Sequence, residues 1–224
     1  HCCFFNATAP TGIYNLSLHD ALPIYCPRCG RTSNEPPSFS VGCSQCMNTD
    51  FRVDGFARIG EYDGLIASLI RRFKFSRCQQ LGGPLSDALA TALNARPWFC
   101  ELDGLVPVPI SWRSRLEYRF SPPDALARHV GGKLDLPLLP LLFEHGKRRR
   151  QVGLSYAERC LNVKGAFRLR RGARPAGGIF CIVDDVSTTG STVNEVARVL
   201  KQAGATRVYA AVLAKPHPDR AHSL

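Results

Sequence analysis

The feature that most constrains the fold is a strand–helix–strand succession near the C-terminus, between Gly178 and Lys215. GIFCIVDD (178–185) is a nearly continuous apolar run, typical of a strand that is buried on both faces. Apolar residues then recur at helical spacing over 193–203, and TRVYAAVLAK (206–215) predicts a second strand. Because consecutive strands joined through a helix run parallel with a right-handed crossover, we predict an α/β fold with a parallel sheet.

The loop between the first strand and the helix has an unusual composition. Two acids, Asp184 and Asp185, end the strand, and a run of small hydroxyl residues and glycine leads to the helix N-terminus. Ligands of open α/β sheets bind beyond the carboxyl ends of the strands, and a helix N-terminus favours an anion. The acids would repel a phosphate, but they suit the vicinal hydroxyls of a ribose or a bound Mg²⁺. The loop therefore predicts a sugar-phosphate site, with an ordinary Asp-rich turn as the alternative.

The candidate binding residues form one continuous segment. They are Val183, Asp184, Asp185, Val186, Ser187, Thr188, Thr189, Gly190, Ser191 and Thr192. The hydroxyls are donors for a phosphate, and glycine lets the backbone approach it closely. The Walker loop and the dinucleotide-binding fingerprint are both absent from the sequence, which removes the two commonest phosphate-binding competitors.

Four of the ten cysteines have the spacing of a metal-binding module. Two C-x2-C pairs, Cys26/Cys29 and Cys43/Cys46, are separated by thirteen residues. Such pairs can bring four thiolates to one tetrahedral ion, and soft thiolates favour zinc over magnesium or calcium. A disulfide framework is the alternative. Because no secretory signal is recognisable, we expect reduced thiols, a structural zinc ion and a cytoplasmic location.

The chain is expected to divide into four parts. Residues 1–25 start at His1 rather than Met and include a stretch that resembles a translated adaptor sequence, so we expect a non-native leader. Residues 26–50 are expected to form the zinc module, residues 51–215 the α/β domain and residues 216–224 a tail. No apolar run approaches about 18 residues, so no membrane span is expected.

Further elements are expected in the first half of the α/β domain. Helical spacing predicts three more helices, over 61–75, 83–97 and 124–135. We expect Gly131–Gly132 to interrupt the last of these, and Lys74 to complement the dipole at the C-terminal end of the first. GLVPVPI (104–110) predicts a strand that runs into a loop. Cys100 and Cys181 lack partner spacing and are expected to be small buried apolar groups.

The positive charge is concentrated in one segment of the chain. The formal net charge is +11, and residues 110–175 hold 15 Lys or Arg against 5 Asp or Glu. Such a segment attracts polyanions, for instance nucleic acid or a polyphosphorylated metabolite, although a basic solubility face is the alternative. Aromatic residues are scattered through the segment and do not suggest a base-stacking platform.

At the level of motifs, VDDVSTTGST (183–192) is similar to the phosphoribosyl-pyrophosphate (PRPP) binding motif of type I phosphoribosyltransferases. The cysteine pairs, YDGLIASLIRRFKF (62–75), LVPVPIS (105–111) and RRRQVGLSYAERCLNVKGAF (148–167) follow the order of the ComF family of phosphoribosyltransferase-like competence proteins. The last block is the most discriminating, and the resemblance covers about residues 26–215. It implies a Rossmann-like phosphoribosyltransferase domain preceded by a zinc-ribbon-like module.

The resemblance implies an enzyme as the first hypothesis. The chain would bind PRPP or a related ribose phosphate with Mg²⁺ and transfer the phosphoribosyl group to an unknown acceptor. Asp184 and Asp185, the candidate catalytic residues, would hold the ribose hydroxyls near the positive charge that develops at C1, and 188–192 would hold the 5-phosphate. Mg²⁺ would assist the departure of pyrophosphate. Cations at 147–150 would neutralise further charge, unless they form a solvated surface.

A departure from the family pattern supports a second hypothesis. The family usually has R-G-F-N-Q soon after the P-V-P strand, whereas this chain has Tyr118–Pro122 and keeps only the phenylalanine. If that loop handles pyrophosphate or the acceptor, turnover is in question. The chain would then be a non-enzymatic DNA-uptake factor that binds single-stranded DNA through its basic segment and contacts a DNA-uptake motor protein.

Overall fold

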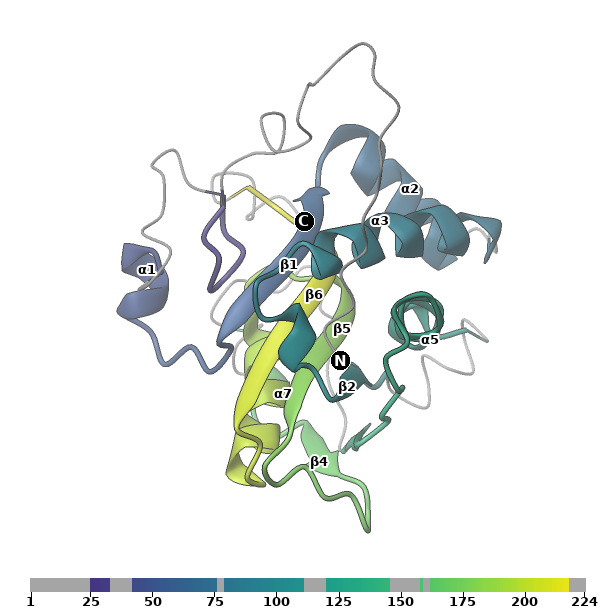
Figure 1. The fold of residues 1–224 in the computed structure, drawn as a ribbon. Coiled ribbons are helices and arrows are strands. Elements are labelled where there is room, and N and C mark those ends of the chain that lie inside the picture. The colour runs from purple at the N-terminus through teal and green to yellow at the C-terminus, as the bar shows by residue number, and fades with distance from the viewer. Residues whose placement is uncertain are drawn as a thin grey trace, which may run out of the picture.

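A four-stranded, all-parallel sheet forms the centre of the molecule in the computed structural model, which describes residues 25–32, 42–75, 79–110, 120–145, 158 and 162–217 (Figure 1). The strands lie in the order β1–β6–β5–β2, and each adjacent pair is parallel. Their bounds are β1 Gly55–Glu61, β2 Gly104–Pro107, β5 Ile179–Val186 and β6 Arg207–Lys215. The predicted α/β fold with a parallel sheet is therefore confirmed.

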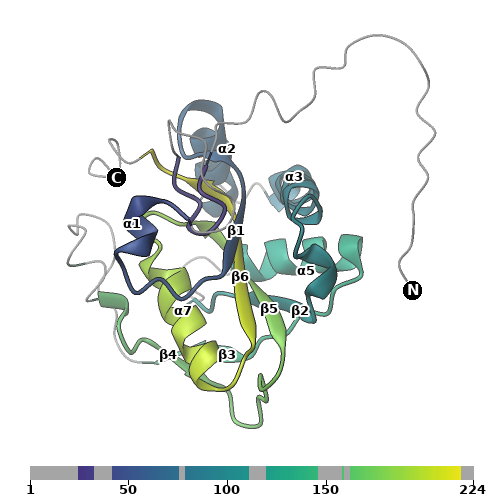
Figure 2. The same cartoon turned by 60° about the vertical axis from the view of Figure 1, so that its left-hand side comes forward.

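Helices cover both faces of this sheet (Figure 2). One face carries α2 (Gly64–Phe75), α3 (Gly82–Asn94) and α5 (Pro122–Leu134), with short 3-10 turns at Gln79–Leu81 and Phe99–Glu101. The other face carries α7 (Ser191–Gln202), a two-stranded antiparallel sheet of β3 (Leu142–Glu144) and β4 (Phe167–Leu169), and the short α1 (Ser44–Met47). Of the helices that the structure describes, none has the length and apolarity needed to cross a membrane.

Strand β5 lies between β6 and β2 and separates two apolar cores. Phe180 and Ile182 pack into the core on the α7 side, whereas Cys181 and Val183 pack into the core beneath α2, α3 and α5. A strand covered in this way needs apolar side chains on both faces, which explains the continuous apolar run. Burial also raises the pKa of the Cys181 thiol, as expected for an inert core cysteine.

Strand β1 is an element that the sequence pattern did not predict. GFARIGE pairs in parallel with β6 along the edge of the sheet. The sequence of β1 does not show the expected pattern of buried apolar residues, because the charged Arg58 is almost fully buried. Its guanidinium donates to Thr32 Oγ1 at 2.8 Å and lies over the Tyr25 ring. Burial lowers the pKa of Arg58, since desolvation disfavours its charged form.

Two local predictions were wrong. Helix α5 continues through Gly131–Gly132 and ends at Leu134, followed by Asp135 in the left-handed conformation. Gly131 is a packing residue, because a Cβ there would lie 2.6 Å from the carbonyl oxygen of Leu136. Cys100 is exposed, since it lies in a 3-10 turn at the surface and not in an apolar layer.

Candidate functional site

The two acids lie at the carboxyl end of β5, beside the start of the next loop. Asp184 and Asp185 are both buried, at 8% exposure, although they are charged groups at the end of a strand. Each carboxylate accepts a hydrogen bond from the next backbone N–H, at 2.9 Å from Asp185 N and 2.6 Å from Val186 N. Because successive strand side chains alternate between faces, the two acids flank the end of β5 on opposite sides of the sheet.

Lys74 at the end of α2 reaches the second of these acids. Its Nζ lies 2.9 Å from Asp185 Oδ2. Burial alone lowers the pKa of Lys74, but the charge and hydrogen bond of Asp185, with the charge of Asp184, outweigh it and raise the pKa. The sequence did not predict this ion pair; it indicated only that Lys74 complements the dipole at the C-terminal end of the helix. The sequence shows Lys74 as one of three cations near the end of α2. Only the tertiary structure, in which α2 packs over β1 and β6, shows that this cation reaches Asp185.

The loop after β5 brings the predicted phosphate-binding residues to the N-terminus of α7. Gly190 is the N-cap residue with φ of 81°, and the hydroxyls of Thr189 and Ser191 lie 2.7 Å apart. The positive φ at Gly190 favours glycine, and a Cβ there would also lie tightly against the Phe51 ring, at 3.3 Å. Ser187 Oγ is buried and has no hydrogen-bond partner within the described residues.

The four predicted metal ligands converge in space. All four sulfur atoms lie within 4.8 Å of one another, and three pairs of the set, Cys26/Cys46, Cys29/Cys43 and Cys43/Cys46, are separated by 3.8, 3.6 and 3.8 Å. Tetrahedral zinc with Zn–S bonds of about 2.3 Å requires sulfur separations of about 3.8 Å. A disulfide needs about 2.05 Å, so this geometry fits a metal site and not the disulfide alternative.

The electrostatics of the cysteine cluster also suit a cation. The Cys26 sulfur accepts hydrogen bonds from the Cys29 side chain and from neighbouring backbone N–H groups, including Cys43 N at 3.2 Å, and these lower its pKa to about 4. Burial and the nearby sulfur charges raise the pKa of Cys46 to about 11. A metal ion would relieve this crowding of thiolates, and the cluster can therefore hold a metal such as zinc.

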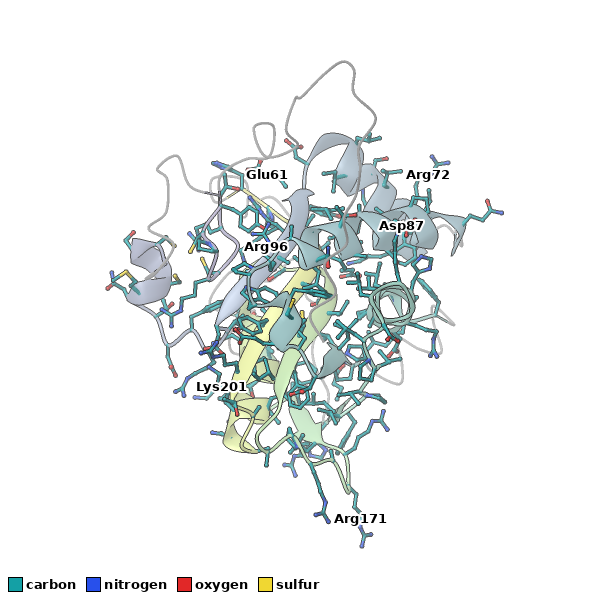
Figure 3. All side chains as sticks on the ribbon, viewed as in Figure 1. Glu61, Arg72, Asp87, Arg96, Arg171 and Lys201 are labelled. Carbon is teal, nitrogen blue, oxygen red and sulfur yellow. The ribbon has the colours of Figure 1, made fainter. Side chains whose placement is uncertain are left out.

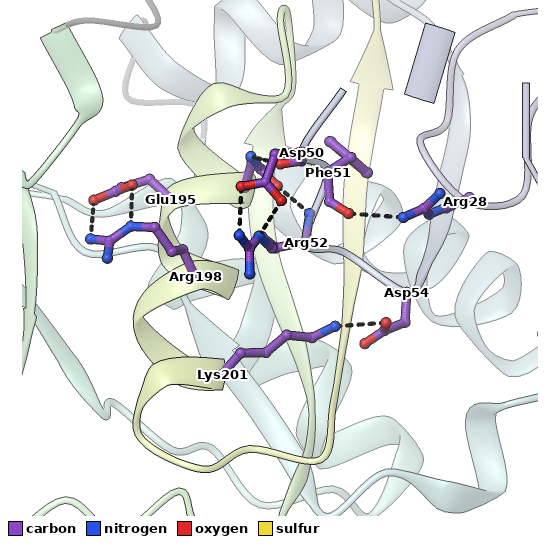
Figure 4. A network of polar contacts seen from close by, with 9 residues as sticks. Arg28, Asp50, Phe51, Arg52, Asp54, Glu195, Arg198 and Lys201 are labelled. Atoms are coloured by element: carbon purple, nitrogen blue, oxygen red, sulfur yellow. Dashed lines mark hydrogen bonds and ion pairs between the residues drawn. The ribbon is translucent and has the colours of Figure 1, made fainter. Parts of the chain in front are cut away.

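The module that carries these cysteines is anchored on the α/β domain. The Pro27 carbonyl accepts from Phe56 N at 2.7 Å on edge strand β1. On the other side, Asn194 of α7 accepts from Arg52 N at 2.5 Å and donates to the Asp50 carbonyl at 3.0 Å. Figure 4 shows this segment beside α7, with the Arg28–Phe51 hydrogen bond at 3.0 Å and the Asp54–Lys201 ion pair at 2.7 Å next to it.

A pocket of about 370 Å³ lies between the module and the loop. The module contributes Cys29, Arg31 and Cys46 to its walls, and the domain contributes Phe51, Thr189–Ser191 and Lys215. Among the described residues, neither Asp184 nor Asp185 lines it. The loop residues 189–191 therefore belong to the lining of this pocket, whereas the two acids lie outside it as the structure describes it.

Helix α7 places one neutralised acid in the pocket wall. Glu195 accepts from Arg198 Nε at 2.8 Å and from Arg198 Nη2 at 2.6 Å (Figure 4). It also accepts from Gly165 N at 2.7 Å. Burial by itself raises the pKa of Glu195, but these hydrogen bonds outweigh it and hold the pKa below its usual range. The carboxylate is therefore fully engaged and adds little free negative charge to the pocket.

The segment that departs from the family pattern, Tyr118–Pro122, is described by the structure from Phe120 onward, at the start of α5. Ser121 caps the helix by accepting from Asp124 N at 3.4 Å, and Pro122 occupies its first turn. Phe120 packs edge-on against Phe73 of α2, with ring centroids 5.1 Å apart. Tyr118, the cations at 147–150 and most of the block at 148–167 lie outside the described residues.

A protein-family comparison identifies a known domain in the second half of the chain. Residues 142–223, which include β5, the loop, α7 and β6, match the family model described as the phosphoribosyl transferase domain. Among solved structures, the chain is similar to adenine phosphoribosyltransferase from Rhodothermus marinus, with a TM-score of 0.39, 22% identity, and coverage of 61% of this chain and 68% of that chain. The fold is a parallel-sheet α/β fold of the phosphoribosyltransferase type.

Curated relatives narrow this class to a family. The chain is 29% identical to competence protein F of Haemophilus influenzae, over 81% of this chain and 82% of that protein. It is 30% identical to the DNA utilization protein YhgH of Escherichia coli K12, over 82% of this chain and 80% of that protein. The chain belongs to this ComF family of competence protein F and the DNA utilization proteins.

Removal of two ligands tests the metal site. We expect the parent protein to contain about one zinc ion per chain, and Cys26→Ser with Cys43→Ser to lose it, because two thiolates cannot complete a tetrahedral site. Elemental analysis of the purified proteins measures this. Cys100→Ser is the matched control, since its thiol is exposed and lies in the 3-10 turn at Phe99–Glu101, and it should keep the metal. A folded parent protein without metal would contradict the assignment.

Replacement of Lys74 tests the charge balance of the acids. Lys74→Met leaves Asp185 mostly buried and without its cation, so we expect the free energy of unfolding to fall by about 2 kcal/mol. Urea denaturation measures the change. Arg72→Met, on the exposed side of the same helix, should change stability by less than about 0.5 kcal/mol. Equal effects of the two substitutions would show that the ion pair contributes nothing specific.

Proposed function

We propose that the chain binds PRPP, or a related ribose phosphate, with Mg²⁺ at the carboxyl end of β5. The observation that carries this proposal is the arrangement of VDDVSTTGST (183–192), in which two acids end a buried strand and a left-handed glycine opens a twelve-residue helix. The phosphoribosyl transferase domain match covers the same segment. The free N–H groups of the helix N-terminus suit a phosphate, and the carboxylates suit vicinal hydroxyls.

The residues take distinct roles in this proposal. Asp184 and Asp185 accept the ribose hydroxyls and lie near C1, where positive charge develops in the transition state. Segment 188–192 holds the 5-phosphate through its hydroxyls and backbone N–H groups. Lys74 pairs with Asp185 and fixes the position of its carboxylate. Ser187, whose buried hydroxyl has no partner among the described residues, would gain one from a ligand or its water.

Transfer of the phosphoribosyl group is the reaction that such a site favours. The bond between C1 and pyrophosphate breaks while a bond from C1 to the acceptor nucleophile forms, and pyrophosphate leaves with the electron pair. Mg²⁺ bound to the pyrophosphate would supply charge neutralisation to this leaving group. The chain contributes positioning of the ribose and stabilisation of the charge at C1, which are the main sources of rate acceleration in such displacements.

Zinc is the ion that we propose for the cysteine cluster, in a reducing, cytoplasmic setting. Four thiolates in tetrahedral geometry favour zinc among the divalent ions. The cysteines of the described residues are free, and several are buried where a reducing compartment would keep them as thiols. The ion would stabilise the fold of the module and has no proposed part in the transfer step.

Exchange of both acids for amides tests the ligand. We expect Asp184→Asn with Asp185→Asn to weaken PRPP binding by about 100-fold in the presence of Mg²⁺, because two charge-assisted hydrogen bonds to the ribose are lost. Isothermal titration calorimetry measures the dissociation constants. Asp135→Asn is the control, since this exposed residue lies after α5 in a conformation that Asn tolerates. Absence of PRPP binding in the parent protein would refute the proposal.

A second candidate function is binding of single-stranded DNA. Four exposed arginines gather on β4 and the turn after it, at the end of the sheet opposite to the acids, and Arg171 extends away from the fold there (Figure 3). They are Arg168, Arg170, Arg171 and Arg174. The names of the relatives refer to competence and DNA utilization, and such a cluster is suited to phosphate contacts. A motor protein of DNA uptake would then be a partner.

The arginine cluster makes a quantitative prediction about salt. Arg171→Gln with Arg174→Gln should weaken binding of labelled oligothymidylate and reduce the slope of log K against log salt by about 1.4, because each lost phosphate contact contributes about 0.7. Fluorescence anisotropy at several salt concentrations measures both effects. Arg72→Gln, an exposed arginine on α2, should leave the slope unchanged. An unchanged slope in the double variant would exclude the cluster as the DNA-binding surface.

A further inference from the structure

Two cations of the sheet are almost fully buried beside the cysteine module. Arg58 of β1 has 1% of its surface exposed, and Lys215, the last residue of β6, has 4%. Among the described residues, no ion pair joins either cation to an acid. A charge that is removed from water is unfavourable unless an opposite charge compensates it, so both positions require negative charge nearby.

The first cysteine pair lies on a short hairpin that packs directly on β1. An antiparallel bridge between Tyr25 and Thr32 closes this hairpin. The Arg58 guanidinium lies 4.7 Å from the centroid of the Tyr25 ring and donates to Thr32 Oγ1 at 2.8 Å, so it contacts both ends of the hairpin. The Pro27 carbonyl, between the two cysteines, accepts from Phe56 N at 2.7 Å. Strand β1 therefore places a buried charge against the segment that carries two of the candidate metal ligands.

Lys215 reaches the same segment from the end of β6. Its Nζ lies 5.5 Å from the centroid of the Phe56 ring, and Gly30 packs against that ring from the other side of the second cysteine of the hairpin. Cys29 and Cys46 line the same pocket as Lys215. Burial lowers the pKa of Lys215 to about 8, and the charges of Cys29 and Cys43 oppose this effect. The ammonium thus lies within the field of the cysteine sulfurs.

Carboxylates supply little negative charge to these two cations. Burial lowers the pKa of Arg58, and the charges of Tyr25, Glu61 and Cys29 oppose this effect. The Glu61 carboxylate already accepts from the Thr32 hydroxyl at 2.6 Å, and Arg58 Nε has no hydrogen-bond partner within the described residues. The charges of Arg31 and Arg58 also lower the pKa of Lys215, which shows that three cations lie near one another. They need more negative charge than one carboxylate provides.

A metal ion bound to the four cysteines would supply that negative charge. Four thiolates carry four negative charges and zinc carries two positive charges, so the complex is a dianion. The four sulfur atoms lie within 4.8 Å of one another, and two of them line the pocket of Lys215. Charged groups around a metal site tune its affinity almost as strongly as the ligands themselves. Two buried cations next to this cluster are therefore suited to stabilise the charged complex.

We propose that Arg58 and Lys215 are the counter-cations of the metal–thiolate complex, so that metal binding and the docking of the cysteine module on the sheet are coupled. The inference rests on the zinc site proposed above and is independent of PRPP binding. Each cation lowers the free energy of the dianionic complex, and the complex compensates charges that the sheet buries. The metal holds the module on β1 through charge as well as through ligand geometry.

Neutralisation of Lys215 tests the pairing through metal affinity and stability together. Competition with a chromophoric zinc chelator measures the dissociation constant of zinc from the full chain, and Lys215→Met should raise it about tenfold. Lys215→Arg keeps the charge and should stay within about threefold of the parent protein. The metal-free Lys215→Met chain should be at least as stable to urea as the metal-free parent, because a buried charge is removed. Lys133→Met, at an exposed position on α5, should leave zinc affinity unchanged.

A purely structural role of Lys215 would give a different pattern. Lys215→Met would then destabilise the metal-free and metal-loaded chains equally with unchanged zinc affinity, and this result would overturn the proposal. If Lys215→Met does not fold, Arg58→Met takes its place, with weaker zinc binding in support and unchanged binding against. A folded parent protein that binds no zinc would overturn the proposal together with the zinc site. Titration of PRPP into the parent protein reports separately on the proposed function.

Discussion

The burial of β5 between two parallel neighbours is the constraint on which the rest of the structure depends. The carboxyl ends of parallel strands lie along one edge of the sheet. Val186 at the end of β5 and Lys215 at the end of β6 therefore lie close together there, beside the loop to α7. The sheet needs helices on both faces, and α2 and α7 therefore also reach this edge, one with Lys74 and the other with its N-terminus. Every group of the candidate site is positioned by this single packing arrangement.

The loop divides the electrostatics of that edge into two regions. On the α2 side, Asp185 is neutralised by Lys74, which favours groups that donate hydrogen bonds, as ribose hydroxyls do. On the module side, Lys215 and Arg31 line a pocket together with Cys29 and Cys46, so cations and cysteine sulfurs face each other there.

The cysteine module has a second structural role at the edge of the sheet. Strand β1 is an edge strand, and such strands attract further strands unless they are covered. The module covers β1 through the hydrogen bond from Phe56 N to the Pro27 carbonyl. Gly30 also lies directly against the Phe56 ring, since a Cβ at Gly30 would be only 2.3 Å from it. Metal binding would therefore stabilise both the module and the edge of the sheet that it covers.

The sequence by itself determined the parallel sheet, the two acids, the loop and the four cysteines, because local patterns indicate each of them. The spacing of apolar residues indicates the strands and helices, and the position of the acids marks the end of a strand. The run of hydroxyl residues and glycine indicates the loop, and the C-x2-C pairs indicate the metal ligands. It did not predict β1, in which a buried Arg58 hides the alternation, or the partnership of Lys74 with Asp185. Nor did it indicate that Lys215 and Arg31, 184 positions apart in the chain, face one pocket. These features depend on which surfaces pack together, and only the tertiary structure decides that, since burial and charge pairing join residues with no local relationship.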